Sequence, residues 1–480
     1  MPVASDGSAT GYSVDVQYGS IFSPFQAPSL IALTALVGGF NFDCSAPFTF
    51  LDIGCGDGTS AMMIAAAYPH ARVIGIDLNP NHIECAVEDA KSGQIDNATF
   101  HLADIAHLAD LDLGVVDMVT VAGLYSWLDR GRRQHLIRTV SERLRPGGLL
   151  HLHYASQPGS AQTDALHRAM RILAPKTGGS VEQLDGALAA LRPAAQLGMK
   201  FFERNPLAAA RAQSIINGVP ANEAHDVMNH QDGGLWFSDV DEDLTVAGFR
   251  HVGDTDQAVD TPELHQTNAL GEALRRPRGP GRETLKDLVL NRASRQDVFV
   301  RLPGTSVESP GDSPHRPIYV TPRGRTLSAE AGLALGSLAG DAGRLLGELM
   351  SDPAAMPPND RQTSAVCRAL FGLGLLVPSV EASRPVRSEA RSLSPFNAFQ
   401  LAKSLRTGVA GPLASPVLGT QLLLPIEDLW RLAGWTGMSA EEIAGGNETA
   451  RQHAERLLEL AVHPGHGEAF AELSVIGVLQ

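Results

Sequence analysis

The chain has 480 residues, more than one compact core usually holds, so we expect two or three domains. Apolar residues make up 44% of the chain and charged residues 19%, a mixture that is typical of globular proteins and excludes a disordered chain. The net charge of −15 argues against binding of nucleic acid through overall charge. No apolar run approaches the ~20 residues of a membrane-spanning helix, and residues 1–10 lack the regions of a signal peptide.

The cysteine and histidine positions argue against a metal centre. The four cysteines form no close C-x-x-C pair, which excludes a zinc knuckle and a disulfide framework and fits a protein of the reducing cytoplasm. His151 and His153 share one face of a predicted strand, and His463 lies near His466, but neither pair has a third ligand at metal spacing. We therefore predict no metal site.

In chain order, short apolar runs alternate with helical stretches from about residue 45 to residue 155. The predicted strands are Pro47–Ile53, Arg72–Asp77, Ala98–Leu102, Val115–Ala122 and Leu149–Tyr154. The predicted helices are Thr59–Tyr68, a helix that begins at Pro80 after the cap residue Asn79, and Arg130–Leu144, which is followed by a turn at Pro146-Gly147-Gly148. This alternation predicts an α/β core with a doubly wound, Rossmann-like parallel sheet.

The remaining sequence predicts helical accessory domains. Residues 160–225 have a helical composition, Arg275–Arg282 reads as a loop, Pro303–Arg325 reads as a linker, and helical patterns return from Thr326. The predicted division is an N-terminal cap segment at 1–45, the core at 46–158, a mostly helical middle domain at 159–302, a linker at 303–326 and a mostly helical C-terminal domain at 327–480.

The most informative segment is a glycine loop that follows the first predicted strand. It reads Asp52-Ile53-Gly54-Cys55-Gly56-Asp57-Gly58, so the glycines alternate as G-x-G-x-G. A dinucleotide-binding loop reads G-x-G-x-x-G and cradles a pyrophosphate. An acidic loop such as this one repels a pyrophosphate and suits a ligand with a cationic amino group. The spacing therefore favours S-adenosylmethionine (SAM) over NAD.

Two further acids follow predicted strands. Asp77 ends the second strand, where a carboxylate can accept both ribose hydroxyls, and Asp104 follows the third strand, where it could accept the adenine amino group. With them we expect Leu78, Ile105 and Ala122 to contact the cofactor. The alternatives are that Asp77 only forms the turn before Pro80 and that Asp104 only caps a short helix.

This combination resembles the class I SAM-dependent methyltransferases, and further motifs resemble bacterial members that carry a methyltransferase regulatory domain. The segments that carry this resemblance are Gly11–Tyr18 with Pro28, Gly123–Trp127 (GLYSW), Tyr154–Gly159, Phe201–Pro206, His225–Asn229, Phe237–Val240 and Asn291–Arg301. The best-known members are rickettsial protein lysine methyltransferases. The resemblance implies SAM as cofactor, a protein acceptor, helical accessory domains, a homodimer and an N-terminal segment in which Tyr18 closes over the cofactor.

Methyl transfer from a sulfonium needs alignment and exclusion of water more than a nucleophilic side chain. Aromatic rings can hold an amine by cation–π contact. Tyr125 and Trp127 follow the fourth strand, so we predict that they form the acceptor slot with Tyr154, and Tyr12 is a weaker candidate. The alternative for the first pair is core packing.

Three functions fit the sequence. The first is a methyltransferase that modifies a nitrogen atom of a protein or peptide side chain, namely lysine. The second is a methyltransferase for a small molecule such as a secondary metabolite or a glycan precursor, and the third is a SAM-binding scaffold without activity. A wide cleft beside the core would favour a protein acceptor, and a closed apolar cavity would favour a small one.

Overall fold

The computed structural model describes most of the chain up to residue 303 and parts of the chain beyond it. The described ranges are 15–16, 23–229, 233–265, 268–303, 319–322, 334–351, 361–373, 376–379, 393–407, 410–416, 420–422, 424–444, 451–452, 454–455 and 457–458. The predicted N-terminal cap motif therefore lies largely outside the described residues, as does most of the predicted linker.

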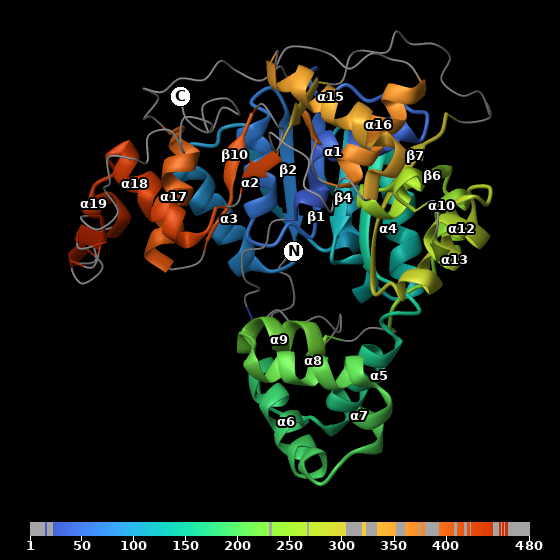
Figure 1. Cartoon of the computed structure of the whole chain (residues 1–480). Coiled ribbons are helices and arrows are strands. Elements are labelled where there is room, and N and C mark those ends of the chain that lie inside the picture. The colour runs from blue at the N-terminus through green and yellow to red at the C-terminus, as the bar shows by residue number, and fades with distance from the viewer. Residues whose placement is uncertain are drawn as a thin grey trace.

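Within the described residues, seven strands form one twisted, mixed sheet in the order β3-β2-β1-β4-β5-β7-β6 (Figure 1). These strands are β1 Thr49–Ile53, β2 Arg72–Asp77, β3 Ala98–Leu102, β4 Val116–Ala122, β5 Leu144–Ala155, β6 Phe249–Asp254 and β7 Ser294–Arg301. β1 to β5 are parallel, and β7 runs antiparallel between β5 and β6. The direction of winding reverses between β1 and β4, and ligands of such sheets bind beside that point.

Helices cover both faces of the sheet because each face is apolar. The elements around the sheet are η2 Pro24–Gln26, α1 Pro28–Val37, α2 Thr59–Ala67, α3 Pro80–Ser92, η3 Ile105–Asp110, η4 Tyr125–Trp127, α4 Arg130–Arg143, α10 Phe237–Val246, α11 Gln257–Asp260, η5 Pro262–Leu264, α12 Ala269–Leu274 and α13 Pro280–Leu290. The side chains of α1 and α2 share one core with Phe50 and Val298, and those of α4 and α10 share the opposite core with Leu51 and Phe299. The predicted Rossmann-like α/β core is confirmed.

Local capping explains why two of the core helices begin where they do. The side chain of Asn79 accepts a hydrogen bond from the amide of Asn81 at the start of α3, and Asp129 accepts one from the amide of Arg132 at the start of α4. Pro80 occupies the first position of α3, where its missing N–H costs nothing.

Three expectations about this part of the chain need correction. The sheet is mixed rather than parallel, because β6 and β7 come from beyond residue 158 and complete it. The predicted turn Pro146-Gly147-Gly148 lies inside β5, where the pairing with β4 shifts register between Val116 and Met118. The predicted loop Arg275–Arg282 is shorter, because Pro280 already begins α13.

The predicted helical region after residue 160 forms a subdomain that stands off the sheet (Figure 1). Its helices are α5 Ala161–Leu173, α6 Ser180–Gln196, α7 Lys200–Arg204, α8 Pro206–Asn217 and α9 Pro220–Met228. The subdomain has a core of its own, built on buried residues such as Leu166, Met170 and Leu184. We call α5–α9 the helical subdomain.

The described elements of the C-terminal region are mostly helical, as predicted. They are β8 Tyr319–Pro322, η6 Gly336–Leu338, α15 Ala339–Ser351, α16 Arg361–Gly372, β9 Leu376–Ser379, α17 Pro395–Thr407, β10 Leu413–Ser415, β11 Thr420–Leu422, α18 Ile426–Thr436 and α19 Ala440–Ala444. Phe396 of α17 packs with Met62, Met63 and Ala90 of α2 and α3, so this region supports the helix that follows the glycine loop. Among the described residues, no helix has the length and apolarity that crossing a bilayer requires.

Candidate active site

The glycine loop turns sharply between β1 and α2. Gly54, Gly56 and Gly58 have φ angles of 79°, 56° and 75°, values that L side chains rarely adopt. A Cβ atom at Gly56 would meet nothing within 4 Å, whereas one at Gly58 would lie 2.7 Å from the Phe100 ring and 2.8 Å from Cβ of Ala86. Gly56 therefore leaves its backbone open to a ligand, and Gly58 lets α2 pack closely on β3 and α3.

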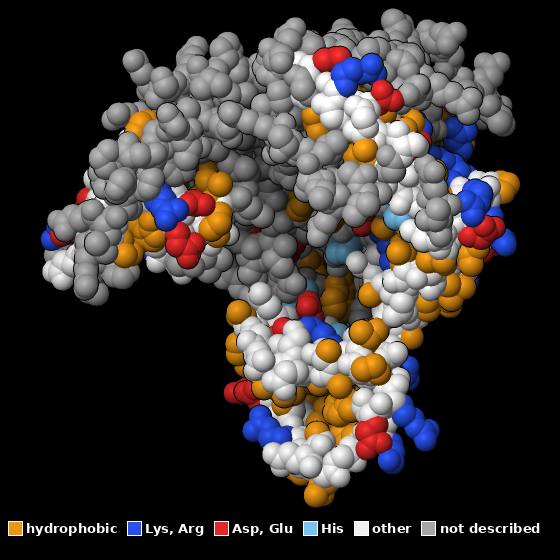
Figure 2. Space-filling view, viewed as in Figure 1, with side chains coloured by type: hydrophobic (Ala, Val, Ile, Leu, Met, Phe, Trp, Pro, Cys, Tyr) orange, Lys and Arg blue, Asp and Glu red, His pale blue; other side chains and the backbone are white. Residues whose placement is uncertain are grey.

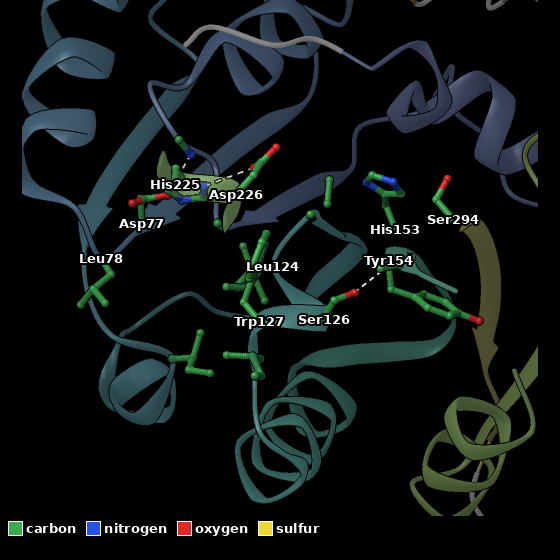
Figure 3. Close-up of a pocket in the computed structure, with 18 of the residues that line it drawn as sticks. Asp77, Leu78, Leu124, Ser126, Trp127, His153, Tyr154, His225, Asp226 and Ser294 are labelled. Atoms are coloured by element: carbon green, nitrogen blue, oxygen red, sulfur yellow. Dashed lines mark hydrogen bonds and ion pairs between the residues drawn. The ribbon is translucent and has the colours of Figure 1, made fainter. Parts of the chain in front are cut away.

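A cavity of about 470 Å³ lies beside this loop, between the carboxyl ends of the parallel strands and the helical subdomain. Figure 2 shows the hollow, with histidine and charged side chains on the wall that the subdomain provides. Figure 3 shows Asp77 and Leu78 on one side, His153 and Ser294 on the other, and Trp127 between them. The cavity therefore has two halves, which we call the β2 half and the Trp127 half.

In the β2 half, the carboxylate of Asp77 is held in place by three neighbours. Its Oδ2 accepts a hydrogen bond from the amide of Gly56 at 2.9 Å, and its Oδ1 accepts one from the amide of Asn79 at 2.8 Å. The Nδ1 atom of His82 lies 3.2 Å from Oδ1. Because Asp77 is only 7% exposed yet lines the cavity, it presents a fixed carboxylate at the end of β2.

The other predicted cofactor residues divide into those that line the cavity and those that do not. Gly54, Leu78, Asp104, Ile105 and Ala122 line it together with Asp77 and Gly56. Asp104 also accepts a hydrogen bond from the amide of Ala106, so it caps η3 as well. Asp52 and Gly58 support the loop from behind, and Tyr18 and Tyr12 lie outside the described residues.

Asp52 is a buried carboxyl group at the end of β1. It is 2% exposed, and burial, followed by the nearby charge of Asp77, raises its pKa to about 7. The two buried acids Asp52 and Asp77 give the surroundings of this loop an acidic character. A ligand with a cationic group fits there, and a pyrophosphate does not.

The β2 half fits SAM as a ligand. The open backbone at Gly56 allows close approach, Asp77 offers acceptors for ribose hydroxyls, and Asp104 offers an acceptor for an amino group. Leu78 and Ile105 supply apolar surface for a base. These features lie together around one cavity.

In the Trp127 half, the three predicted aromatic residues are not equivalent. Trp127 is half-buried and lines the cavity, whereas Tyr125 is 1% exposed and does not. The hydroxyl of Tyr154 donates to Oδ2 of Asp297 at 2.6 Å, and its ring packs edge-on against Tyr125 at 6.1 Å. Tyr154 lines the cavity as Trp127 does, although it is only 1% exposed, whereas Tyr125 is placed in the core behind them.

A hydrogen bond ties this aromatic segment to the end of β5. The Oγ atom of Ser126 accepts a hydrogen bond from the amide of Ala155 at 2.7 Å, as drawn in Figure 3. Ser126 is 5% exposed. The bond fixes η4, and therefore Trp127, relative to the sheet.

The two histidines of β5 have different surroundings. His151 is fully buried and pairs with Thr120 Oγ1 at 3.0 Å and with Gln296 Oε1 at 3.1 Å, and burial lowers its pKa to about 3. His153 lines the cavity, and burial lowers its pKa as well. The negative charge of nearby Asp254 acts in the opposite direction and raises the pKa. Both imidazoles are therefore neutral at pH 7. Within the described part of the chain, no group of three or more metal-binding side chains is arranged to hold an ion.

The sequence did not reveal that the helical subdomain completes the cavity. Four of its side chains line the Trp127 half: His167 of α5, Arg211 of α8, and His225 and Asp226 of α9. The ring of His225 lies 5.9 Å from that of Trp127. Nothing in the local sequence signals this contact, because it joins segments about a hundred residues apart.

These side chains form a charged cluster. Nη2 of Arg211 lies 2.8 Å from Glu223 and 3.6 Å from Asp226, and its Nε donates to Nε2 of His167 at 3.2 Å. Burial, followed by Arg211 and Arg171, lowers the pKa of His167 to about 4. At pH 7 His167 is therefore neutral.

Comparison with known proteins identifies two conserved regions of the chain. A family described as a methyltransferase domain matches residues 50–148, and a family described as a predicted methyltransferase regulatory domain matches residues 224–301. The first match contains the glycine loop, and the second contains the end of α9 from residue 224, together with β6 and β7. The chain therefore contains a methyltransferase domain together with this regulatory domain. Its cofactor is SAM, as the glycine spacing predicted.

The fold resembles that of two solved structures over nearly the whole chain. PKMT2 from Rickettsia typhi is 16% identical, with a TM-score of 0.66 over 96% of this chain and 100% of that one. The same protein in complex with AdoHcy is 17% identical, with a TM-score of 0.65 over 96% of this chain and 99% of that one. The helical subdomain and the C-terminal region therefore belong to a known architecture.

Relatives by sequence are of two kinds. An uncharacterised protein of Synechocystis sp. is 24% identical over 98% of this chain and 99% of its own length. A trans-aconitate 2-methyltransferase of Paracidovorax citrulli is 32% identical, but over only 27% of this chain and 46% of its own length. The match to trans-aconitate 2-methyltransferase therefore covers only about a quarter of this chain.

Proposed function

We propose that this methyltransferase transfers a methyl group to an amine on a protein or peptide side chain, namely that of lysine. The observation that carries the proposal is the Trp127 half of the cavity, where an indole ring lies 5.9 Å from the ring of His225, and the neighbouring Asp226 lines the same cavity. An aromatic face together with a carboxylate suits a cationic amine. The full-length likeness to PKMT2 supports a protein acceptor more than the partial likeness to trans-aconitate 2-methyltransferase supports a small one.

The side chains of this protein then have three tasks. SAM, when bound, supplies a methyl group on a positively charged sulfur. Asp77 and the backbone at Gly56 hold the cofactor in the β2 half, and Ser126 holds the segment that carries Trp127. Trp127 orients the acceptor and excludes water. The amine binds as the ammonium ion and loses its proton to solvent before the neutral nitrogen attacks the methyl group, a loss that desolvation favours and the charge of Asp226 opposes.

Two further features belong to the proposal. We propose a homodimer formed through the helical subdomain, on which several apolar side chains are exposed. We also propose a cytoplasmic location, because the spacing of the four cysteines is not that of a disulfide framework.

The proposal is tested by incubating the protein with methyl-labelled SAM and a bacterial lysate, and separating macromolecules from small molecules. We expect label in protein, recovered as methyl-lysine after acid hydrolysis, and none with Asp77→Ala. Label in the small-molecule fraction would instead support a metabolite acceptor. Binding of SAM without any transfer would support a scaffold.

A further inference from the structure

The wall of the cavity opposite Trp127 is provided by α9 of the helical subdomain. His225 and Asp226 are adjacent on this helix, and both line the cavity. The side chain of His225 is 8% exposed and that of Asp226 is 33% exposed. At this wall the carboxylate is therefore the more accessible of the two groups.

The charges around Asp226 leave it with net negative character. Nη2 of Arg211 lies 2.8 Å from Glu223 but 3.6 Å from Oδ2 of Asp226, so Glu223 is its closer partner, and Oδ1 of Asp226 lies 3.6 Å from Nδ1 of His225. His167, which receives a hydrogen bond from Arg211, is neutral at pH 7 because its pKa is lowered to about 4. The ion-pair contacts of Asp226 are therefore longer than that of Glu223, and its partly exposed carboxylate can still accept a ligand.

A second carboxylate in the cavity wall is already engaged. Oδ2 of Asp164 accepts hydrogen bonds from Gln157 Nε2 at 3.0 Å, from Ser160 Oγ at 2.9 Å and from the amide of Gly234 at 2.9 Å. Asp164 therefore fastens the start of α5 to the segment before α10. It is less suited than Asp226 to bind an acceptor.

We infer that Asp226 anchors the acceptor as a primary alkylammonium group, with the indole face of Trp127 as the second wall of that subsite. The inference rests on the proposed function, because it deepens the assignment of an amine acceptor. It also gives the regulatory domain a direct part in substrate choice, since the end of α9 from residue 224 lies in the region that defines this domain. A neutral alcohol of the same size gains neither the ion pair nor the cation–π contact.

The experiment measures binding of n-butylammonium chloride to the protein saturated with AdoHcy, with n-butanol as the neutral probe of matched shape. The protein contains four tryptophans, so labelling the indole nitrogens gives a simple NMR spectrum. The signal of Trp127 is assigned by its loss in Trp127→Phe. We expect n-butylammonium, and not n-butanol, to shift this signal in a saturable way.

Asp226→Asn keeps the size of the side chain and removes its charge. We expect this variant to bind n-butylammonium about tenfold more weakly or worse, the scale of one charge-assisted contact. The matched control is Asp185→Asn, since Asp185 is an exposed acid on α6 of the same subdomain that does not line the cavity. It should bind like the wild type, and both variants should bind AdoHcy like the wild type.

The outcomes separate the inference from the proposed function. Equal binding of n-butylammonium by wild type and Asp226→Asn, or equal binding of n-butylammonium and n-butanol by the wild type, would overturn the inference. In the lysate assay, the inference also predicts that Asp226→Asn labels protein at least about tenfold more slowly than Asp185→Asn. If the wild type labels no protein but binds n-butylammonium through Asp226, the inference stands and the protein acceptor does not.

Discussion

At the scale of single residues, the cavity uses two carboxylates in different ways. Asp77 is buried and held by the amides of Gly56 and Asn79, so its position is set before any ligand arrives. Asp226 is a third exposed and has looser contacts at 3.6 Å. Cofactor binding should therefore depend on the first acid, and acceptor binding on the second.

The first prediction concerns Asp77. Asp77→Ala removes the acceptors at the end of β2, and SAM affinity should fall by roughly 2–3 kcal/mol, the scale of losing charge-assisted hydrogen bonds. Asp112→Ala is the control, because Asp112 is exposed and does not line the cavity. Calorimetry that shows unchanged affinity in folded Asp77→Ala would contradict the assignment.

The second prediction concerns Trp127. If this side chain aligns the acceptor, Trp127→Ala should lower turnover about tenfold or more, while SAM affinity stays near that of the wild type. Trp236→Ala is the matched control, since Trp236 is 38% exposed and lies outside the cavity wall. Normal turnover in a stable Trp127→Ala protein would remove the residue from the site. Unfolding, measured by the melting temperature, would instead indicate a core role.

The third prediction is a pH dependence of stability that comes from His167. Its pKa is about 4 in the folded protein and about 6.5 when unfolded, so the unfolded chain binds more protons between these values. The stabilisation is present above pH ~6.5 and decreases as the pH falls toward ~4, by about 2 kcal/mol at pH ~5. The melting temperature of His167→Gln should therefore fall less than that of the wild type on acidification. An identical fall in both proteins would show that His167 carries no such effect.

At the scale of elements, the sequence predicted the core better than what surrounds it. The strand bounds Arg72–Asp77 and Ala98–Leu102 agree with the structure. The first is a buried parallel strand, which is a short apolar run with clear ends, and the second is the edge strand beside it. β6 and β7 were missed since they lie among helices and join the sheet antiparallel. Similarly, the glycines predicted the β2 half of the cavity, whereas the contact of α9 with Trp127 depends on tertiary packing that no local pattern encodes.

The fourth prediction compares two glycines of one loop. In Gly56→Ala the new Cβ has no neighbour within 4 Å among the described residues, so its cost there is that of the left-handed backbone, about 1 kcal/mol, but the methyl group occupies space that faces the ligand. Its melting temperature should change little while SAM affinity falls. In Gly58→Ala the Cβ clashes with Phe100 and Ala86, so the melting temperature should fall clearly. If Gly56→Ala binds SAM normally, this part of the loop is not a contact surface.

At the scale of the whole molecule, the helical subdomain has two different surfaces. Its inner side completes the cavity, and its outer surface exposes apolar side chains, some of which are visible in Figure 2. Ile172 is 66% exposed, Leu197 is 89% exposed and Val219 is 61% exposed. Such exposure of large apolar side chains is typical of a surface that is covered in an assembly.

The last prediction is that this outer surface forms the homodimer. Light scattering at micromolar concentration should then give twice the chain mass of 50.8 kDa. Replacing Ile172 with Asp should shift the mass toward a single chain, because burying an unpaired carboxylate in an apolar interface is costly. Val246→Asp is the control, since Val246 is as exposed, at 85%, but lies at the end of α10. A single-chain mass for the wild type would contradict the dimer, and an effect of Val246→Asp without one of Ile172→Asp would move the interface to another surface.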